Sequence, residues 1–567
     1  MKPMLELLIP PFIFFIGALL VPLIPTGIAR GVVTLLVPAV AAGVLWHVGL
    51  GNFFQVTFYG LELELMRVDE RSRIFALVFC LAAFLAAIYA WHLKDTIQQV
   101  ATLFYAGSAV GAALAGDLIT FFFYWEGTAI ASVFLIWARG TEGAYWTGLR
   151  YLAVQIGSGV ILIAGVVLFY FETGSIAFDT MTLGSIATWM IFVALGIKCA
   201  FPFFHSWLLD SYPAGTITGT VILSAFTTKL AIYALARGFA GTELLIYIGA
   251  IMAVLPAFFA LVENDLRRVL CHAVLVQLGF MVVGVGLGTE LALYGVAGHA
   301  VVHILYKSLL FMAIGAVMFR TGSAKATDLG GLHRTMPWTT LFCVIGAISS
   351  AAFPLFSGFV TKTMILDEAA KAQYQLVWVA LVFAGAAVLA HSGLRVPLKA
   401  FFSKDSGKRP SEAPPHMLWA MGLTAGLCLV IGIFPNLLYA QISPNLDYNA
   451  YTLGHIVGQV QLLLFALLAY ALFALTGLMP EERKGILLDF DWTYRKLGAF
   501  LLAKTSALVS AVWGGVVDFL MRTYQNFVDG LMHTHGPEGR MAREWPTGAM
   551  VLSIALLLAL TLVVNFV

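Results

Sequence analysis

The sequence predicts an all-α polytopic membrane protein with about 14 core transmembrane helices. Its 567 residues are 60% hydrophobic and only 11% charged, whereas soluble proteins carry about 25% charged residues. Apolar runs that reach the roughly 20 residues of a membrane span fill the chain from end to end. Two of these runs contain a similar proline-centred phrase, AFPFFHSW from Ala200 to Trp207 and AFPLFSGF from Ala352 to Phe359.

The apolar runs place the helices in order along the chain. The first three occupy residues 7–25, 31–49 and 73–93. The others are expected over residues 98–115, 117–137, 149–171, 187–210, 216–236, 243–263, 267–287, 292–319, 337–366, 374–396, 416–440, 455–478 and 546–567. The first run has no small-residue cleavage site and leads into further spans, so it is not expected to be a signal peptide.

Residues 487–535 have a different pattern from the spans around them. Charged residues recur there among apolar ones, namely Asp491, Arg495, Lys496, Lys504, Asp518 and Arg522. Such a pattern is typical of an amphipathic helix that lies along a surface. A plain membrane helix over residues 498–520 is the alternative interpretation.

The two proline phrases predict broken helices and an internal repeat. Proline removes a helical hydrogen bond, and freed carbonyls are tolerated in a membrane only where protein or water satisfies them. Broken helices at matching positions are typical of transporters built from inverted repeats. The breaks fall in the seventh and twelfth helices, five spans apart and therefore opposite in direction. We expect four regions: residues 1–97, 98–236 and 243–396, with the last two as inverted five-helix repeats, and 397–567.

The distribution of loop charges predicts the orientation. Lysine and arginine are more frequent in the loops on the side opposite to the N-terminus. By the positive-inside rule, the N-terminus should lie outside a cell inner (plasma) membrane.

Titratable residues recur at hydrophobic depth: Glu126, Lys198, His205, Lys229, His272, His299, His303, Lys307, Lys362 and His391. A charge at mid-bilayer costs about 2.5–3.5 kcal/mol on insertion scales. A structural ion pair with Glu126 accounts for one lysine but not for four. The surplus favours a path for protons or ions, in which histidines relay protons near neutral pH.

Each histidine also has a simpler interpretation as a satisfied core group. His391 is close enough to a helix end to lie at the membrane interface. His299 and His303 share one helix face, where they could ligate haem or a metal, but no nearby Asp, Glu or Cys completes a metal site.

Several classes of site are not supported by the sequence. The cysteines are isolated (Cys80, Cys199, Cys271, Cys343 and Cys428), so neither an iron–sulfur cluster nor structural zinc is expected. No nucleotide-binding fingerprint is present, and no cofactor is expected. A net charge of +2 gives no indication of a nucleic-acid partner.

The run IKCAFPFFHSWLLDSYPAGTITGTVILSAFTTKLAIYALAR resembles the antiporter-like subunits of respiratory complex I, membrane-bound hydrogenases and Mrp multisubunit cation/proton antiporters. That pattern is a lysine, a proline break, a proline-bearing loop and a second lysine, here Lys198, PFFHSWLL, Pro213 and Lys229. The runs FFFYWEGTAI, GHAVVHILYKSLLFMAIGAV and DLGGLHRTMPWTTLFCVIGAISSAAFPLFSGFVTKTMIL also resemble the family. The sequence departs from it at His272-Ala273 and Phe353-Pro354, and the likeness covers residues 73–440.

The resemblance implies a role for each buried group. Glu126 would pair with Lys198, and Lys229 would continue a hydrophilic axis. His299, His303 and Lys307 would bridge to Lys362. The run SEAPPHMLWAMG resembles the D-type Mrp protein. The tail beyond residue 480 resembles the lateral-helix extension found in the large antiporter-like subunit of complex I and in the A-type Mrp protein.

The expected function is therefore an ion-translocating subunit of a multisubunit Mrp-type Na⁺/H⁺ antiporter. Protons would move along lysines, histidines, Glu126 and water, and other membrane subunits would be partners. One alternative is a proton-pumping subunit of a redox-driven complex such as complex I or a hydrogenase. A second is a membrane subunit that drives inorganic carbon uptake with a soluble zinc protein.

Overall fold

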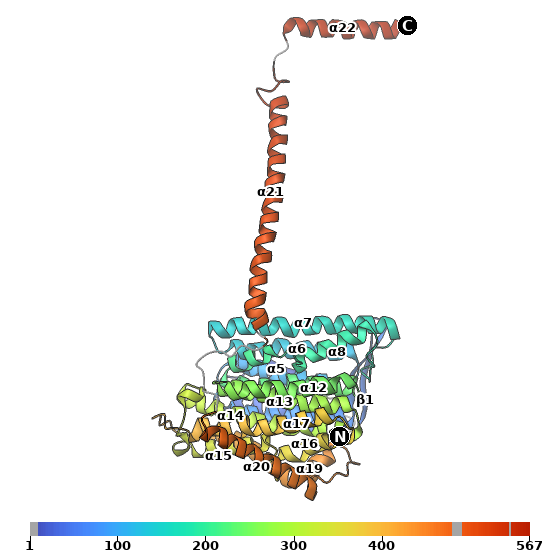
Figure 1. Ribbon diagram of the computed structural model, residues 1–567. Coiled ribbons are helices and arrows are strands. Elements are labelled where there is room, and N and C mark those ends of the chain that lie inside the picture. The colour runs from blue at the N-terminus through green and yellow to red at the C-terminus, as the bar shows by residue number, and fades with distance from the viewer. Residues whose placement is uncertain (1–8, 479–489, 491, 544–545, 567) are drawn as a thin grey trace. The chain divides into compact units, whose positions relative to one another are not determined.

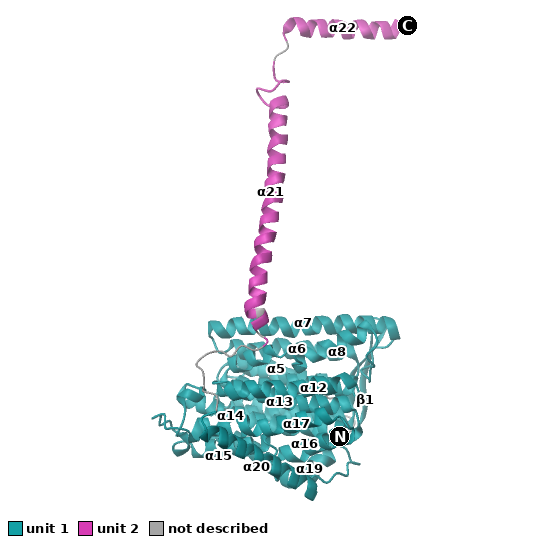
Figure 2. Ribbon diagram, viewed as in Figure 1, with its two compact units in different colours: residues 1–489 teal, residues 490–567 magenta. Residues whose placement is uncertain are grey.

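The computed structural model describes residues 9–478, 490, 492–543 and 546–566. The chain forms two compact units, Met1–Asp489 and Phe490–Val567 (Figure 2). Within the described residues, 14 helices are long and apolar enough to cross a membrane. The helices of the first unit run roughly parallel to one another (Figure 1). The predicted polytopic helical fold is confirmed.

The helices and strands of the first unit follow in the order α2 (Pro10–Leu20), η1 (Val21–Leu23), α3 (Ile28–His47), β1 (Gly51–Phe58), β2 (Leu61–Val68), α4 (Glu70–Tyr89), α5 (Thr96–Leu114), α6 (Leu118–Trp137), α7 (Glu142–Thr173), α8 (Ile186–Cys199), α9 (Ser206–Ala214), α10 (Ile217–Ala225), α11 (Thr227–Gly238), α12 (Glu243–Val262), α13 (Leu266–Leu287), α14 (Glu290–Thr321), η2 (Ala326–Asp328), η3 (Leu332–Arg334), α15 (Pro337–Ser350), α16 (Ser357–Lys371), α17 (Gln375–Val388), η4 (Leu389–Arg395), η5 (Leu398–Phe402), α18 (Pro415–Ile433), α19 (Asn436–Ile442) and α20 (Leu453–Leu475).

A β-hairpin that the sequence did not predict lies between α3 and α4. Strands β1 and β2 pair antiparallel, with Gly51 opposite Val68 and Phe58 opposite Leu61. The alternation in LELELMRV is the period-2 pattern of a strand. The hairpin was not predicted because neither strand contains an apolar run long enough to span a membrane.

Both proline phrases interrupt a helix in the same way. Helix α8 ends at Cys199 and α9 begins at Ser206, while α15 ends at Ser350 and α16 begins at Ser357. In each break, two non-glycine residues adopt positive φ values: Ala200 and Phe203 in the first, Ala352 and Leu355 in the second. Pro213, expected in a loop, lies instead within the last turn of α9.

A shared backbone pattern recurs 148 residues further along the chain. Helix α7 has 32 residues between a Thr141 N-cap and a left-handed Gly174. Helix α14 also has 32 residues, between a Thr289 N-cap and a left-handed Gly322. The segments after these helices pair with the caps of α6 and α13 through two matching bridges, Asp117 with Ala177 and Asp265 with Lys325.

Helices α13 and α14 are almost wholly buried at the centre of the first unit. Helix α12 approaches α13 closely through glycine, since a Cβ at Gly279 would lie 2.5 Å from the amide nitrogen of Ala253. Small residues allow such backbone contact in membrane helices. The titratable side chains of α14 at positions 299, 303 and 307 are therefore buried within the first unit.

The second unit contains η6 (Thr493–Gly498), α21 (Ala499–His535) and α22 (Thr547–Phe566). Helix α21 has 37 residues and is therefore about 55 Å long, which exceeds the ~30 Å hydrocarbon thickness of a bilayer. This length agrees with a helix that lies along a surface. The surface position of the helix stays a prediction. Residues 487–489 and 491 of the predicted segment lie outside the described residues.

Candidate functional site

Most of the predicted titratable residues are withdrawn from the surface of the first unit. The buried members are Lys198, Lys229, His272, His299, His303, Lys307, Lys362 and His391. Glu126 and His205 are half-buried. These groups come from α6, α8, α11, α13, α14, α16 and η4 and from the break before α9, so residues far apart in sequence share one interior.

Lys198 stands at the end of α8, directly before the first break. Its ammonium donates to the Trp125 carbonyl oxygen at 2.5 Å and to the Thr128 hydroxyl at 3.2 Å. It also lies 4.2 Å from the centroid of the Trp125 ring, a cation–π distance. Glu126 is close enough for the two charges to interact, but Glu126 Oε1 has no hydrogen-bond partner among the described residues.

Gly159 on α7 sets the position of the Glu126 side chain. A methyl group at Gly159 would overlap Glu126 Oε1. The carboxylate therefore occupies space that any larger residue at this position would fill.

We expect Gly159→Ala to lower the free energy of unfolding by about 1–3 kcal/mol, the usual cost of an extra methyl in a packed interior. Gly157→Ala is the matched control, because nothing lies within 4 Å of a Cβ at that position of the same helix. There the intrinsic helix preference of alanine stabilises by roughly 0.5–1 kcal/mol. Thermal unfolding of the purified protein in detergent measures both variants, and equal midpoints would contradict the close fit around Glu126.

Lys229 lies beside a second interruption, where α10 ends at Ala225 and α11 begins at Thr227. Its ammonium donates to the Ser224 carbonyl oxygen at 2.5 Å and to the Thr228 hydroxyl at 3.3 Å. Carbonyls at a helix C-terminus carry partial negative charge. The interruption thus gives Lys229 acceptors without a carboxylate.

Helix α14 carries a row of titratable groups on one face. The rings of His299 and His303 are stacked with centroids 6.1 Å apart. Both ring nitrogens of His303 and the Lys307 ammonium have no hydrogen-bond partner among the described residues. Lys307 is within electrostatic range of both Lys229 and Lys362.

His299 is fixed by two uncharged side chains. Its Nε2 lies 3.1 Å from Gln277 Oε1, and its Nδ1 lies 3.0 Å from Thr361 Oγ1. Since an amide oxygen only accepts, Nε2 donates and Nδ1 of the neutral ring accepts from the Thr361 hydroxyl. Gln277 and Thr361 are not among the residues that the sequence predicted for the site. The only signal for them was an uncharged polar residue within an apolar run.

Lys362 on α16 resembles Lys198 in its aromatic contact. Its ammonium lies 4.2 Å from the centroid of the Phe280 ring and has no hydrogen-bond partner among the described residues. A Cβ at Gly385 would lie 3.4 Å from it. The two lysines beside the proline breaks are thus both held against an aromatic face.

The remaining three histidines differ in their surroundings. His391 is fully buried rather than at an interface, in the π-helix η4, and its Nδ1 lies 2.9 Å from Ser392 Oγ. It is within electrostatic range of His272, Lys307 and Lys362. His205 occupies the N-cap position of α9 without a side-chain cap hydrogen bond, and it lines a small apolar pocket with Pro202 and Pro256.

Comparison with known proteins finds similarity to components of membrane complexes. Residues 115–389 match the family described as NADH:quinone oxidoreductase/Mrp antiporter, TM. The chain is 29% identical over 446 residues to the A/B component of a probable K⁺/H⁺ antiporter of Rhizobium meliloti, covering 71% of this chain and 44% of that protein. It is 32% identical over 297 residues to the D component of the Na⁺/H⁺ antiporter of Alkalihalophilus pseudofirmus, covering 48% of this chain and 59% of that protein. The chain thus spans about half the length of these curated relatives.

Two solved structures share the fold. A chain of the Mrp complex from Dietzia sp. DQ12-45-1b superposes with a TM-score of 0.67 and 21% identity, covering 79% of this chain and 95% of that one. A chain of the membrane-bound sulfane sulfur reductase, an archaeal respiratory membrane complex, superposes with a TM-score of 0.72 and 19% identity, covering 98% and 100%. Residues 115–389 of this chain are therefore similar to the NADH:quinone oxidoreductase/Mrp antiporter family, and the two solved structures share its fold.

Proposed function

We propose that this chain is an ion-translocating membrane subunit of a multisubunit Mrp-type Na⁺/H⁺ antiporter, and that protons cross it along buried lysines, histidines, Glu126 and water. The observation that carries the proposal is the set of four buried lysines, Lys198, Lys229, Lys307 and Lys362, whose exposed fractions do not exceed 2%. No ion pair joins any of these four to a carboxylate within the described part of the chain.

A purely structural role explains these lysines poorly. Moving an unpaired ammonium from water into a protein interior costs several kcal/mol of solvation free energy, even after the protein relaxes around it. An apolar residue of similar volume would avoid that cost. Buried polar groups without protein partners are ordinarily satisfied by water, and the ammonium of Lys307 and the ring of His303 lack protein partners among the described residues. Water at these groups would supply the proton links that the side chains alone do not make.

The proposed order of groups follows their neighbours in space. Glu126 and Lys198 interact at one end. Lys229 and Lys307 interact in the middle, and His303 is within electrostatic range of both. His299 joins this row to the Thr361 hydroxyl, whose neighbour in sequence is Lys362. His272 and His391 would flank the row, and His205 would act near the first break.

We further infer that residues 98–236 and 243–396 are the two inverted repeats. The matched lengths of α7 and α14, their identical cap types and the paired bridges support this division. The similar positive-φ pattern in the two breaks supports it as well. Each repeat then supplies one break and one lysine held against an aromatic ring.

The partners that follow from the proposal are other membrane subunits of the complex, protons and a transported cation. The relatives that are named as antiporter components support this assignment. The loop charges support an N-terminus outside the plasma membrane. The proposal includes a D-type role for this chain. One argument for that role is the 32% identity to a D-type antiporter component over 297 residues.

The direct test is cation/proton exchange in everted membrane vesicles. Vesicles from cells that lack only this chain should lose the pH change that follows addition of Na⁺, and the full chain should restore it. K⁺ and Li⁺ in parallel assays identify the cation. Exchange that persists unchanged without the chain would contradict the proposal.

A second candidate is a proton-pumping subunit of a redox-driven membrane complex. The observation in its favour is the length of the fold match, because the sulfane sulfur reductase chain is covered completely and covers 98% of this one. Purification of the intact complex separates the two candidates. Stoichiometric iron–sulfur proteins in the preparation would favour the redox-driven complex, and their absence together with Na⁺-dependent exchange would favour the antiporter.

A further inference from the structure

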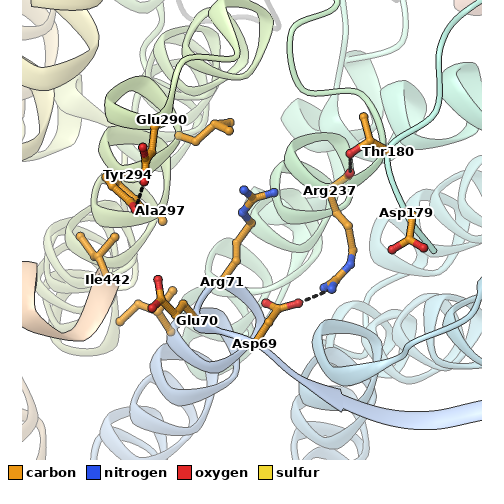
Figure 3. A pocket seen from close by; sticks show the side chains of 12 residues that line it. Asp69, Glu70, Arg71, Asp179, Thr180, Arg237, Glu290, Tyr294, Ala297 and Ile442 are labelled. Atoms are coloured by element: carbon orange, nitrogen blue, oxygen red, sulfur yellow. Dashed lines mark hydrogen bonds and ion pairs between the residues drawn. The ribbon is translucent and has the colours of Figure 1, made fainter. Parts of the chain in front are cut away.

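A cavity of about 430 Å³ with several charged side chains in its lining opens at the end of the first unit that carries the hairpin. Its charged lining consists of Asp69, Glu70, Arg71, Asp179, Arg237 and Glu290 (Figure 3). These residues come from α4, α11, α14 and the segments that precede α4 and α8. None of them belongs to the row of buried lysines and histidines.

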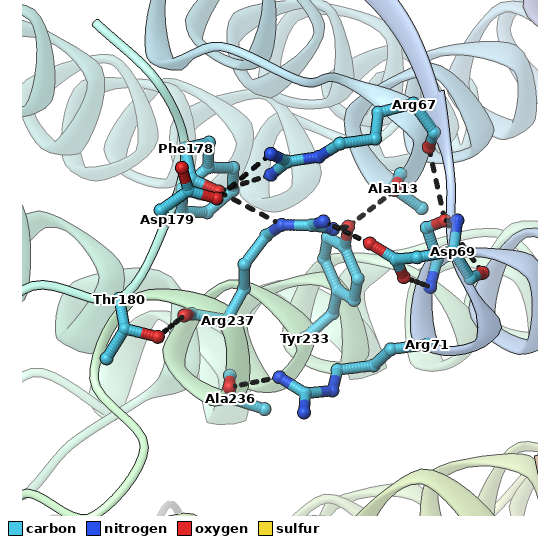
Figure 4. A network of polar contacts seen from close by, with 11 residues as sticks. Arg67, Asp69, Arg71, Ala113, Phe178, Asp179, Thr180, Tyr233, Ala236 and Arg237 are labelled. Atoms are coloured by element: carbon cyan, nitrogen blue, oxygen red, sulfur yellow. Dashed lines mark hydrogen bonds and ion pairs between the residues drawn. The ribbon is translucent and has the colours of Figure 1, made fainter. Parts of the chain in front are cut away.

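The arginines of this cavity are held in fixed places by the surrounding structure (Figure 4). Arg237 forms an ion pair with Asp69 and donates to the Phe178 carbonyl oxygen at 3.1 Å. Arg71 donates to the Ala236 carbonyl oxygen at 2.8 Å. With the cations fixed in this way, the wall of the cavity keeps its shape without a ligand.

The cavity carries an excess of negative charge. Four carboxylates face two guanidiniums in its lining. Arg67 pairs with Asp179 at 2.9 Å from outside the lining, and carboxylates still outnumber guanidiniums when it is included. A concave site with a net negative lining raises the local concentration of cations relative to anions, by about 10-fold where one sign predominates.

The inner end of the cavity reaches the start of the histidine row. Tyr294 and Ala297 of α14 line it together with Ile442 of α19, and His299 follows Ala297 by two residues on the same helix. A Cβ at Gly298 would meet Ile442 Cδ1 at 2.9 Å and Thr361 Cγ2 at 3.0 Å. Ile442 is 2% exposed, and its apolar side chain therefore lies near both the cavity and Thr361, whose hydroxyl bonds to His299.

We propose that this cavity is a water-filled, cation-attracting vestibule for protons, and that Ile442 is the apolar gate between its water and His299. The inference deepens the proposed function, because it names the place where the buried row meets the medium. Protons would reach or leave His299 through water admitted past Ile442. A partner protein that fills the cavity is the competing outcome.

Single cysteines in the assembled complex test the vestibule without measuring transport. All five native cysteines are buried, so a cysteine at Ala297 provides a distinct label site. In right-side-out vesicles we expect Ala297→Cys to react with a cationic, membrane-impermeant methanethiosulfonate about tenfold faster than with the anionic sulfonate analogue, as the negative lining requires. Glu70→Gln combined with Glu290→Gln should bring the two rates together.

Two control positions frame this experiment. Thr180→Cys lies on the exposed rim and should react with both reagents, while Ala300→Cys is fully buried on α14 and should react with neither. An unreactive Ala297→Cys beside a reactive Thr180→Cys would overturn the vestibule. Equal rates with both reagents at Ala297→Cys would overturn its preference for cations.

The gate is tested at Thr361. Thr361 is fully buried, so the cysteine of Thr361→Cys should be protected from both reagents while Ile442 is present. When Ile442→Ala is added, this cysteine should react with the cationic reagent at least about tenfold faster, since the field of the cavity then reaches it. Leu437→Ala on the outer face of α19 is the matched control, because that leucine is 58% exposed. Labelling of Thr361→Cys without Ile442→Ala would place the gate elsewhere. These readouts stand even if exchange assays reject the antiporter assignment.

Discussion

Replacing Lys198 by alanine is expected to lower proton exchange by about 100-fold or more, the loss typical of removing a positioned proton-transfer group. The complex should still assemble, because Lys198 contributes two hydrogen bonds and no ion pair among the described residues. Glu126→Ala should have a similar effect, since Glu126 is the acidic group whose charge acts on this lysine. The measurement is the initial rate of the pH change in vesicles, normalised to the amount of assembled complex.

Lys198→Arg separates a proton carrier from a structural cation. A guanidinium keeps the positive charge but does not release its proton in proteins. We therefore expect this variant to be as inactive as Lys198→Ala. Lys94→Ala, at an exposed lysine, controls for the loss of a lysine in general. Wild-type exchange in Lys198→Arg would show that only the charge matters and would remove Lys198 from the path.

Replacing Lys362 by alanine is the second large expected effect. Lys362 is buried, and its ammonium lies over the Phe280 ring with no hydrogen-bond partner in the described part of the chain. Its removal leaves the Thr361 end of the row without a proton carrier. Exchange should again fall by about 100-fold, while the yield of assembled complex stays close to that of the wild type.

Lys371→Ala provides the control on the same helix. Its side chain is 66% exposed and pairs with Glu368, and surface pairs of this kind contribute about 0–1 kcal/mol. We expect no change in exchange from Lys371→Ala. Normal exchange in Lys362→Ala as well would mean that protons leave the row before α16, so that His391 or the Ile442 vestibule would have to provide the outlet.

The burial of the lysines could be predicted from the sequence because insertion energetics act on runs of residues. Every lysine that was predicted at hydrophobic depth is buried in the first unit. Long apolar runs could not predict the hairpin, because its short alternating strands resemble a polar loop. The loop expected around Pro213 was also wrong, because a proline near the end of a short helix does not interrupt that helix.

Composition and spacing alone determined that this chain is a helical membrane protein, and they identified the buried lysines and the two interrupted helices. These are properties of single segments, which bilayer thickness and proline geometry control directly. Only the tertiary structure decided which groups meet. Lys198 bonds to Trp125 from another helix, His299 bonds to Gln277 and Thr361, and Ile442 lines a cavity together with residues of α4, α11 and α14. Such contacts depend on how helices far apart in sequence pack together, and a single sequence does not state that packing.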